Sequence, residues 1–134
     1  MGNTVLAIGA GLAGLSAALT AAENGCTATL VSTMPSERAQ SVMAEGGINA
    51  ALNTKDEDDS PDEHYRDTIE AGAHLAGPEA VRGMVDAAPG IVERLLGLGT
   101  IFTQDGYQPD LRSFGGQKKK RTLYSRSSTG KQIM

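Results

Sequence analysis

The chain has 134 residues, 40% hydrophobic and 21% charged, which is the composition of one globular domain rather than of a disordered tail. Its net charge of −4 argues against general nucleic-acid binding, and no apolar stretch reaches the roughly 18 residues that cross a membrane. The single cysteine, Cys26, excludes an internal disulfide and a cysteine-based metal cluster; we expect it to be a small buried residue, and we expect no metal site.

The first 31 residues predict a strand, a glycine turn, a helix and a second strand. Thr4–Ile8 is a short apolar run typical of a buried strand, and the β-branched Thr27–Val31 is typical of another. Between them, leucines and alanines at spacings of three and four predict a helix over Leu12–Asn24, which Gly25 ends. This order begins an α/β fold of the Rossmann type, built on a parallel sheet.

The turn between the first strand and the helix has the sequence GxGxxG. Gly9 permits the tight turn, Gly11 lets the backbone approach a pyrophosphate, and Gly14 lets the helix pack closely on the strand. The helix N-terminus also presents unpaired N–H groups to an anion. We therefore predict a dinucleotide site formed by Gly9, Ala10, Gly11, Leu12, Ala13 and Gly14; the alternative is a chance glycine turn in an α/β unit.

The residues after the second strand bear on which dinucleotide is bound. A nicotinamide cofactor usually has its ribose held by an acidic residue about 20 positions beyond the glycines. Ser32 and Thr33 stand there instead, and their hydroxyls can bond to a ribose only without charge assistance. An NAD-dependent dehydrogenase therefore stays open as a hypothesis but is disfavoured.

The middle of the chain is predicted to be mainly helical. The acidic run Asp56–Asp59 is typical of a solvated loop. A proline in the first turn then predicts a helix over Pro61–Ala73. A further helix is expected to start at Pro78, to be divided or restarted at Pro89, and to end near Gly97.

The last third mixes a hairpin, a basic loop and a helix start. Ile101–Tyr107 contains the Asp-Gly pair of a hairpin turn, and Ser128–Met134 is typical of the start of a helix without a stop signal. The basic run Lys118–Arg121 is expected to be a surface or partner-facing loop. His64 and His74 lie in and just after a predicted helix, and we expect each to be solvated or packed rather than chemically active.

A second segment rich in small residues surrounds Gly46 and Gly47. Ala44, Asn49 and Ala50 flank the two glycines, which suggests backbone packed against a flat ligand. The alternative is a helix N-terminus in which small residues pack together.

Three segments in the same order carry a family resemblance. Ala7–Leu15, Ala44–Ala51 and Ser113–Gly130 resemble the flavoprotein subunit of fumarate reductase and succinate dehydrogenase, a family that includes L-aspartate oxidase. The resemblance covers essentially the whole chain but only about the first quarter of such a subunit. It implies that residues 1–134 are the N-terminal part of an FAD-binding domain, with the capping and catalytic regions beyond it.

The resemblance implies FAD as the cofactor and assigns roles to residues. Gly9–Gly14 would hold the FAD diphosphate, and Ser32 and Thr33 would lie near the adenosine ribose. The residues that would run past the isoalloxazine ring, with backbone N–H groups near its N5 edge, are Ser41, Ala44, Glu45, Gly46 and Gly47. Gln40 stands where membrane-complex members have the histidine that bonds covalently to FAD, so the FAD is expected to be non-covalent.

The family also implies an activity for the full-length enzyme. It would be an oxidoreductase that interconverts fumarate and succinate, small dicarboxylates, and exchanges electrons with a partner, often an iron–sulfur subunit. The residues that perform this chemistry lie in later parts of the family's chains, so we assign no catalytic residue and expect the 134-residue chain alone to be inactive. L-aspartate oxidase and a non-catalytic, truncated nucleotide-binding remnant are the alternatives. We expect a cytoplasmic protein, either free or peripheral on the cytoplasmic face of a membrane.

Overall fold

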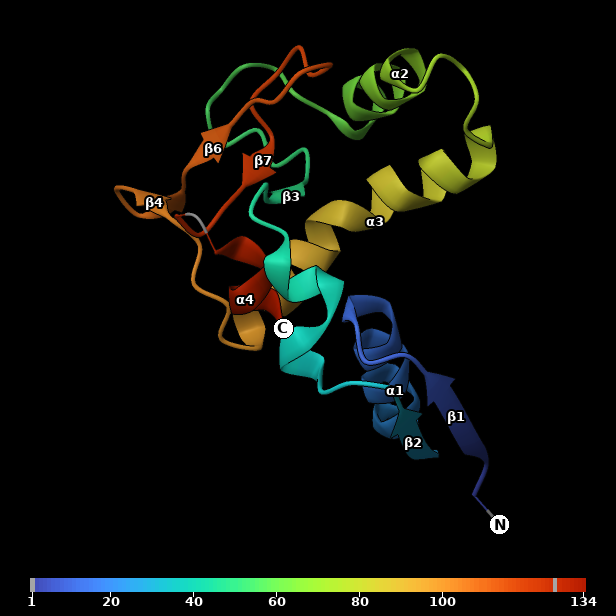
Figure 1. Cartoon of the computed structure of the whole chain (residues 1–134). Helices are drawn as coiled ribbons and strands as arrows, with labels where there is room; N and C mark the ends of the chain where they lie inside the picture. The colour runs from blue at the N-terminus through green and yellow to red at the C-terminus, as the bar shows by residue number, and fades with distance from the viewer. Residues whose placement is uncertain (1, 127) are drawn as a thin grey trace. The chain divides into compact units, whose positions relative to one another are not determined.

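A computed structural model describes residues 2–126 and 128–134, and it divides the chain into two compact units (Figure 1). The first unit contains the segment up to Ala44 together with Gly130–Met134, and the second contains Glu45–Thr129. Among the described residues, no helix is long and apolar enough to cross a membrane.

The first unit is built on a strand–helix–strand element. Strand β1 (Thr4–Ile8) leads through the glycine turn into helix α1 (Leu12–Glu23), and β2 (Thr27–Val31) follows. The two strands pair in parallel, from Thr4 opposite Thr27 to Ile8 opposite Val31. The prediction of an α/β fold with a parallel sheet is confirmed, and both strands have the predicted bounds.

The burial expected for these strands is wrong. Ala7 is the one buried residue of β1, whereas Leu6 is 59% exposed, Ile8 81% and Val31 50%. A parallel sheet is normally covered by helices on both faces. Here the sheet has two strands and one packed helix, so much of its apolar surface remains open.

The rest of the first unit is short helical turns. The 3₁₀ helices η1 (Ser36–Arg38) and η2 (Gln40–Met43) follow β2, and α4 (Thr129–Ile133) lies at the end of the chain. The N–H of Gly130 donates to the carbonyl of Ala44 at 2.7 Å. A Cβ on Gly130 would lie 2.0 Å from the carbonyl oxygen of Ser41, so this close approach requires glycine.

Two helices form one side of the second unit. Helix α2 (Pro61–Ala71) begins as its sequence predicts, with the Ser60 hydroxyl accepting the N–H of Glu63 at 3.2 Å. Helix α3 (Pro78–Gly97) runs unbroken through Pro89, so the expected division there is wrong. Its apolar residues at spacings of three and four are buried and outweigh the cost of the proline: Val81, Val85, Ala88, Val92 and Leu95.

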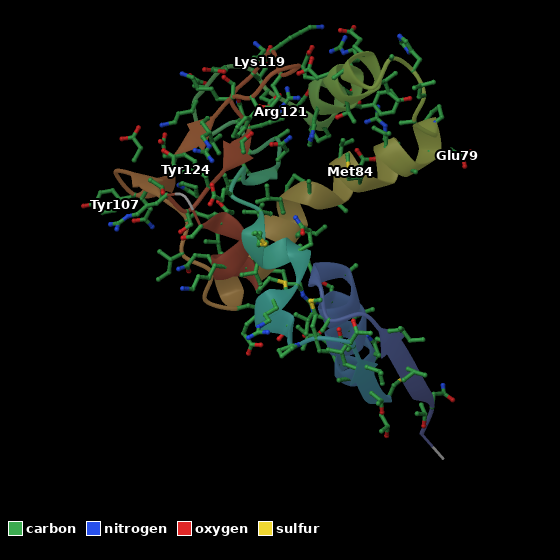
Figure 2. All side chains as sticks on the ribbon, in the orientation of Figure 1. Glu79, Met84, Tyr107, Lys119, Arg121 and Tyr124 are labelled. Atoms are coloured by element: carbon green, nitrogen blue, oxygen red, sulfur yellow. The ribbon has the colours of Figure 1, made fainter. Side chains whose placement is uncertain are left out.

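Short strands form the other side of the second unit. Strand β7 (Thr122–Leu123) lies at the centre of an antiparallel sheet, between β3 (Ile48–Asn49) and β6 (Leu111–Arg112). The predicted hairpin is also present, as β4 (Gln104–Asp105) and β5 (Gln108–Pro109). Tyr107, at the hairpin tip, is fully exposed and projects outward (Figure 2).

Candidate functional site

The glycine turn of the first unit has a backbone that other residues could not adopt. Gly9 has a φ of +106°, a conformation that favours glycine. A Cβ on Gly14 would lie 1.8 Å from the carbonyl oxygen of Gly9, which is far inside any contact distance. The glycine at the third motif position is therefore what allows α1 to start directly against the end of β1, as the sequence predicts.

The start of α1 offers donors to an anion. The first helical hydrogen bond runs from the N–H of Leu15 to the carbonyl of Gly11 at 3.0 Å, so the N–H groups of Ala13 and Gly14 have no intrahelical acceptor. The first turn contains no acidic side chain. These features fit the diphosphate of a dinucleotide, since helix N-termini attract phosphate groups through both free N–H donors and the helix dipole.

Ser41 lies beside this turn although it is 29 residues away from Leu12 in the sequence. Its hydroxyl accepts the N–H of Leu12 at 3.1 Å, and a Cβ on Gly11 would lie 3.2 Å from the same oxygen. The structure thus brings together Ser41 and the GxGxxG residues within the first unit, and the hydroxyl caps a helix start that has no cap of its own.

Ser32 and Thr33 follow β2 directly and are both exposed. The Ser32 hydroxyl accepts a hydrogen bond from the N–H of Met34, at 3.5 Å. The N–H of Gly9, the first residue of the glycine turn, donates to the carbonyl of Val31 at 2.7 Å. Ser32 is the next residue after Val31, so it lies close to the glycine turn. Both hydroxyls therefore lie at the carboxyl ends of the two parallel strands, where dinucleotides bind to α/β sheets.

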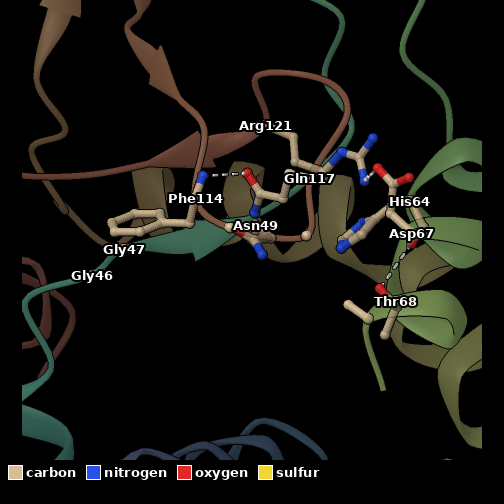
Figure 3. A pocket seen from close by; sticks show the side chains of 12 residues that line it. Gly46, Gly47, Asn49, His64, Asp67, Thr68, Phe114, Gln117 and Arg121 are labelled. Atoms are coloured by element: carbon tan, nitrogen blue, oxygen red, sulfur yellow. Dashed lines mark hydrogen bonds and ion pairs between the residues drawn. The ribbon is translucent and has the colours of Figure 1, made fainter. Parts of the chain in front are cut away.

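The second unit contains a pocket of about 340 Å³. Phe114, Gln117 and Asn49 lie on one side of it, and His64, Asp67 and Thr68 of α2 lie on the other (Figure 3). Gly46 and Gly47 also line the pocket, as do Gly115 and Gly116. Both glycine pairs belong to the segments that carry the family resemblance, so the pocket collects residues that are far apart in the sequence.

Gly47 is held in place by the neighbouring strand. Its φ is +121°, and a Cβ would lie 2.3 Å from the carbonyl oxygen of Leu123 and 2.6 Å from the Cγ2 atom of Thr122. No other residue fits there without moving β7. The Glu45–Gly47 segment is an irregular loop rather than the start of a helix, which removes the helix N-terminus considered as an alternative for these glycines.

A buried charge cluster lies beside the pocket and corrects two expectations. The side chain of Arg121 is 0% exposed and pairs with Asp59 at 2.7 Å. It also pairs with Asp67 at 2.8 Å (Figure 3). Asp59 is thus not part of a solvated loop, and Arg121 is not part of a surface or partner-facing one. The neighbouring lysines are also engaged: Lys118 pairs with Glu70, and Lys120 pairs with Glu57.

His64 of α2 is buried in the pocket wall, while His74 is exposed; both agree with a packed or solvated role. Burial lowers the pKa of His64, and the positive charge of Arg121 lowers it further. The imidazole is therefore neutral near pH 7. Its Nδ1 atom is buried and has no hydrogen-bond partner among the described residues, so it is free to bond to a molecule in the pocket.

Other expectations concern metals and the cysteine. Within the described ranges, no group of three histidine, cysteine or acidic side chains could hold a metal ion. Cys26 is free but half-buried rather than buried. Sequence reasoning missed Arg112 and Gln117. The position of Arg112 depends on the pairing of β6 with β7, and Gln117 donates to Thr122 of β7; neither contact has a local sequence signal.

Comparisons with known proteins agree with this geometry. The family described as "FAD binding domain" matches residues 4–134. The chain is 44% identical over 134 residues to the succinate dehydrogenase flavoprotein subunit of Bacillus subtilis, covering 98% of this chain and 23% of that protein. It is 40% identical to a subunit of the CoM/CoB fumarate reductase of Methanothermobacter marburgensis, covering 97% and 24%.

Further relatives and solved structures belong to the same group. An L-aspartate oxidase of Mesorhizobium japonicum is 42% identical over 102 residues, which is 76% of this chain and 19% of that protein. The Mycobacterium smegmatis Sdh1 complex contains a chain that superposes with a TM-score of 0.92 at 32% identity, covering 98% of this chain and 22% of that one. For the E. coli quinol fumarate reductase the TM-score is 0.88 at 30% identity, with 98% and 23% covered. The chain thus spans about a quarter of the length of the relatives it matches.

Proposed function

Because the chain belongs to the FAD binding domain family, whose members are FAD-dependent oxidoreductases, we propose that its GxGxxG turn holds the FAD diphosphate and that its glycine-lined pocket receives the flavin ring. The observation that carries the first assignment is the contact at Gly14, because a backbone approach of 1.8 Å to a hypothetical Cβ demands glycine beside a helix start with free N–H groups. Ser32 and Thr33 are assigned to the adenosine ribose. Ser41, which the family resemblance places beside the isoalloxazine ring, is assigned here to the diphosphate end of the cofactor instead, because its hydroxyl accepts the N–H of Leu12 at the glycine turn.

The pocket of the second unit is assigned to the reactive end of the flavin. FAD supplies hydride chemistry at its N5 atom when it is bound. Gly46 and Gly47 would donate backbone hydrogen bonds to the ring, and Ala44 and Glu45 would lead the chain past it. Neutral His64, with its unpartnered Nδ1, and the amides of Asn49 and Gln117 would form the polar part of the pocket wall around the ring.

The activity of the whole protein is a proposal because the chain spans about a quarter of its relatives. We propose that it forms part of an oxidoreductase that interconverts fumarate and succinate and exchanges electrons with an iron–sulfur subunit. Several of the solved structures that it resembles are succinate dehydrogenase and quinol fumarate reductase assemblies, which supports a multi-subunit partner. A cytoplasmic location, free or peripheral on the membrane, belongs to the same proposal.

L-aspartate oxidase is the second candidate activity, favoured by identities of 34–42% to several such enzymes. A full-length protein incubated with succinate, fumarate or aspartate separates the two activities. Turnover of aspartate with oxygen, and none of succinate or fumarate, would replace the first candidate by the second. A chain that takes up neither FAD nor substrate would instead be the non-catalytic remnant.

The attachment of FAD can be tested separately. Gln40 begins η2 and has no nucleophilic nitrogen comparable to that of an imidazole, so a covalent bond to the flavin cannot form there. Acid precipitation of the flavin-loaded protein should release all of the flavin into the supernatant. Yellow colour that stays in the protein pellet would contradict non-covalent binding.

The cofactor assignment is tested by titrating the chain with FAD and following the quenching of flavin fluorescence. Saturable binding at one equivalent is expected. Gly11→Val should abolish it, because the branched side chain would fill the space between the turn and Ser41. Ala17→Val is the matched control, since Ala17 is exposed on the same helix. Equal binding by both variants would refute the assignment.

A further inference from the structure

Arg112 contacts the Glu45–Gly47 segment although it is not itself a lining residue of the pocket. It lies in β6, and its register places it in one row with Thr122 of β7 and Asn49 of β3. Its guanidinium Nη2 donates to the carbonyl oxygens of Glu45 and Gly46, at 3.1 and 2.7 Å. The side chain therefore reaches across the sheet to the segment that precedes β3. No ion pair joins it to a carboxylate among the described residues, so carbonyl groups take the hydrogen bonds it makes.

Two aromatic rings fix the guanidinium in this position. Its central carbon lies 4.9 Å from the ring centre of Phe114 and 4.2 Å from that of Tyr124. Tyr124 is anchored in turn, because its hydroxyl donates to Asp110 at 2.6 Å. A planar cation that packs on two rings has little freedom to turn, and this lowers the entropic cost of each hydrogen bond it makes.

The geometry of the peptide bond converts these contacts into an orientation of the amides. In a planar trans peptide, the C=O of one residue and the N–H of the next point in opposite directions. When Arg112 draws the carbonyls of Glu45 and Gly46 to one side, the N–H groups of Gly46 and Gly47 must face the other. Neither N–H donates a hydrogen bond within the described part of the chain, and both glycines line the pocket, whereas Arg112 does not.

We propose that Arg112 is a positioning residue that holds the Glu45–Gly47 segment so that two adjacent backbone N–H groups present themselves to an acceptor atom in the pocket. The identity of that acceptor as a flavin ring rests on the proposed function. The orientation of the segment itself does not, because it follows from contacts within the protein. The segment is constrained at both of its ends. Strand β7 packs against the backbone of Gly47, and Arg112 binds the carbonyl that precedes it.

The test uses a glutamate-specific endoprotease on the full chain without any cofactor. The bond after Glu45 lies between the two carbonyls that Arg112 holds, so cleavage there reports how firmly the segment is held. Arg112→Gln should raise the cleavage rate at this bond about tenfold, since a charge-assisted hydrogen bond is lost at each carbonyl. Rates after Glu93, in the C-terminal part of α3, should stay unchanged. Arg112→Lys keeps the charge but lacks the planar fork, and it should give an intermediate rate.

The control is Arg66→Gln, which removes one positive charge from an exposed position of the same unit and should leave cleavage after Glu45 at the wild-type rate. A rate after Glu45 that stays unchanged in both Arg112 variants would overturn the proposal. So would a uniform rise at Glu45 and Glu93, because Arg112 would then stabilise the unit as a whole. A selective rise after Glu45 supports positioning, even in a variant of lower overall stability.

A second measurement connects the segment to the cofactor and separates the two proposals. In the wild-type chain, saturating FAD should slow cleavage after Glu45, and Arg112→Gln should bind FAD about tenfold more weakly with a shifted absorption of the bound flavin. If the wild-type chain takes up no FAD, the proposed function fails while the cofactor-free cleavage result still decides the role of Arg112. If FAD binds but leaves cleavage after Glu45 unchanged in the wild type, the amides of this segment do not face the flavin.

Discussion

Replacing Arg121 by methionine tests whether the buried charge cluster holds the second unit together. The substitution keeps much of the side-chain volume but removes the cation shared by Asp59 and Asp67, whose side chains are 1% and 2% exposed. Of its ion pairs among the described residues, Asp67 then keeps the longer one with Lys118, at 3.7 Å. Protonating an ordinary aspartate at pH 7 costs about 4 kcal/mol, and this sets an upper limit on the free-energy cost of leaving each carboxylate buried without Arg121. Breaking a buried ion pair by removing one partner typically costs about 3–5 kcal/mol. We therefore expect Arg121→Met to lower the free energy of unfolding by about 4 kcal/mol.

Tyrosine fluorescence during urea unfolding is a suitable assay. The chain has three tyrosines and no tryptophan, and Tyr65, Tyr107 and Tyr124 all belong to the second unit, so the signal reports that unit alone. Arg66→Met is the matched control, because Arg66 is 61% exposed and its pair with Glu63 should contribute less than about 1 kcal/mol. A deficit no larger than that of the control would refute the reasoning.

Two further predictions concern the glycine turn and the buried histidine. Gly14→Ala forces a Cβ against the carbonyl of Gly9 and should abolish FAD binding in titrations, whereas Gly90→Ala, with open space at its Cβ, should bind FAD normally and unfold at slightly higher temperature. Because the pKa of His64 is lowered in the folded chain, the unfolded chain takes up a proton that the folded chain refuses, so the free energy of unfolding should fall as the pH drops from about 7.5 to about 5.5. His64→Gln should flatten this fall in urea titrations and His74→Gln should not; the opposite pattern would contradict the assignment.

The first unit could be predicted from sequence because its signals are local. The apolar run of β1, the glycines after it and the leucine spacing of α1 each act within about ten residues, and their order along the chain predicts the element. Parallel pairing of β1 with β2 then follows from the connection, since a helix between two strands carries the chain back to the same end of the sheet. The sheet's exposure could not be predicted in this way, because burial depends on how many strands and helices the sheet has.

The helix through Pro89 shows how packing overrides a local rule. A proline inside a helix costs about 3 kcal/mol, and the sequence alone gives no reason to accept that cost. Val85 and Val92 on either side of it are 0% and 1% exposed. Burying two such side chains contributes about 1.5–3 kcal/mol each, which exceeds the cost of the proline. The helix therefore continues through Pro89, because the free energy gained by burying its apolar side chains exceeds the cost of the proline.

The basic run shows why the site itself is harder to predict than the fold. Lys118, Lys120 and Arg121 look equivalent in a string of four cations, yet only Arg121 has a side chain that is wholly buried. The difference arises because Arg121 comes immediately before β7, where pairing with β3 and β6 fixes the backbone. The same pairing places Arg112 beside the Glu45–Gly47 segment from 66 residues away. A partner so distant leaves no periodic or compositional trace in the sequence, so the residues that shape the pocket become recognisable only when the order of the short strands is known.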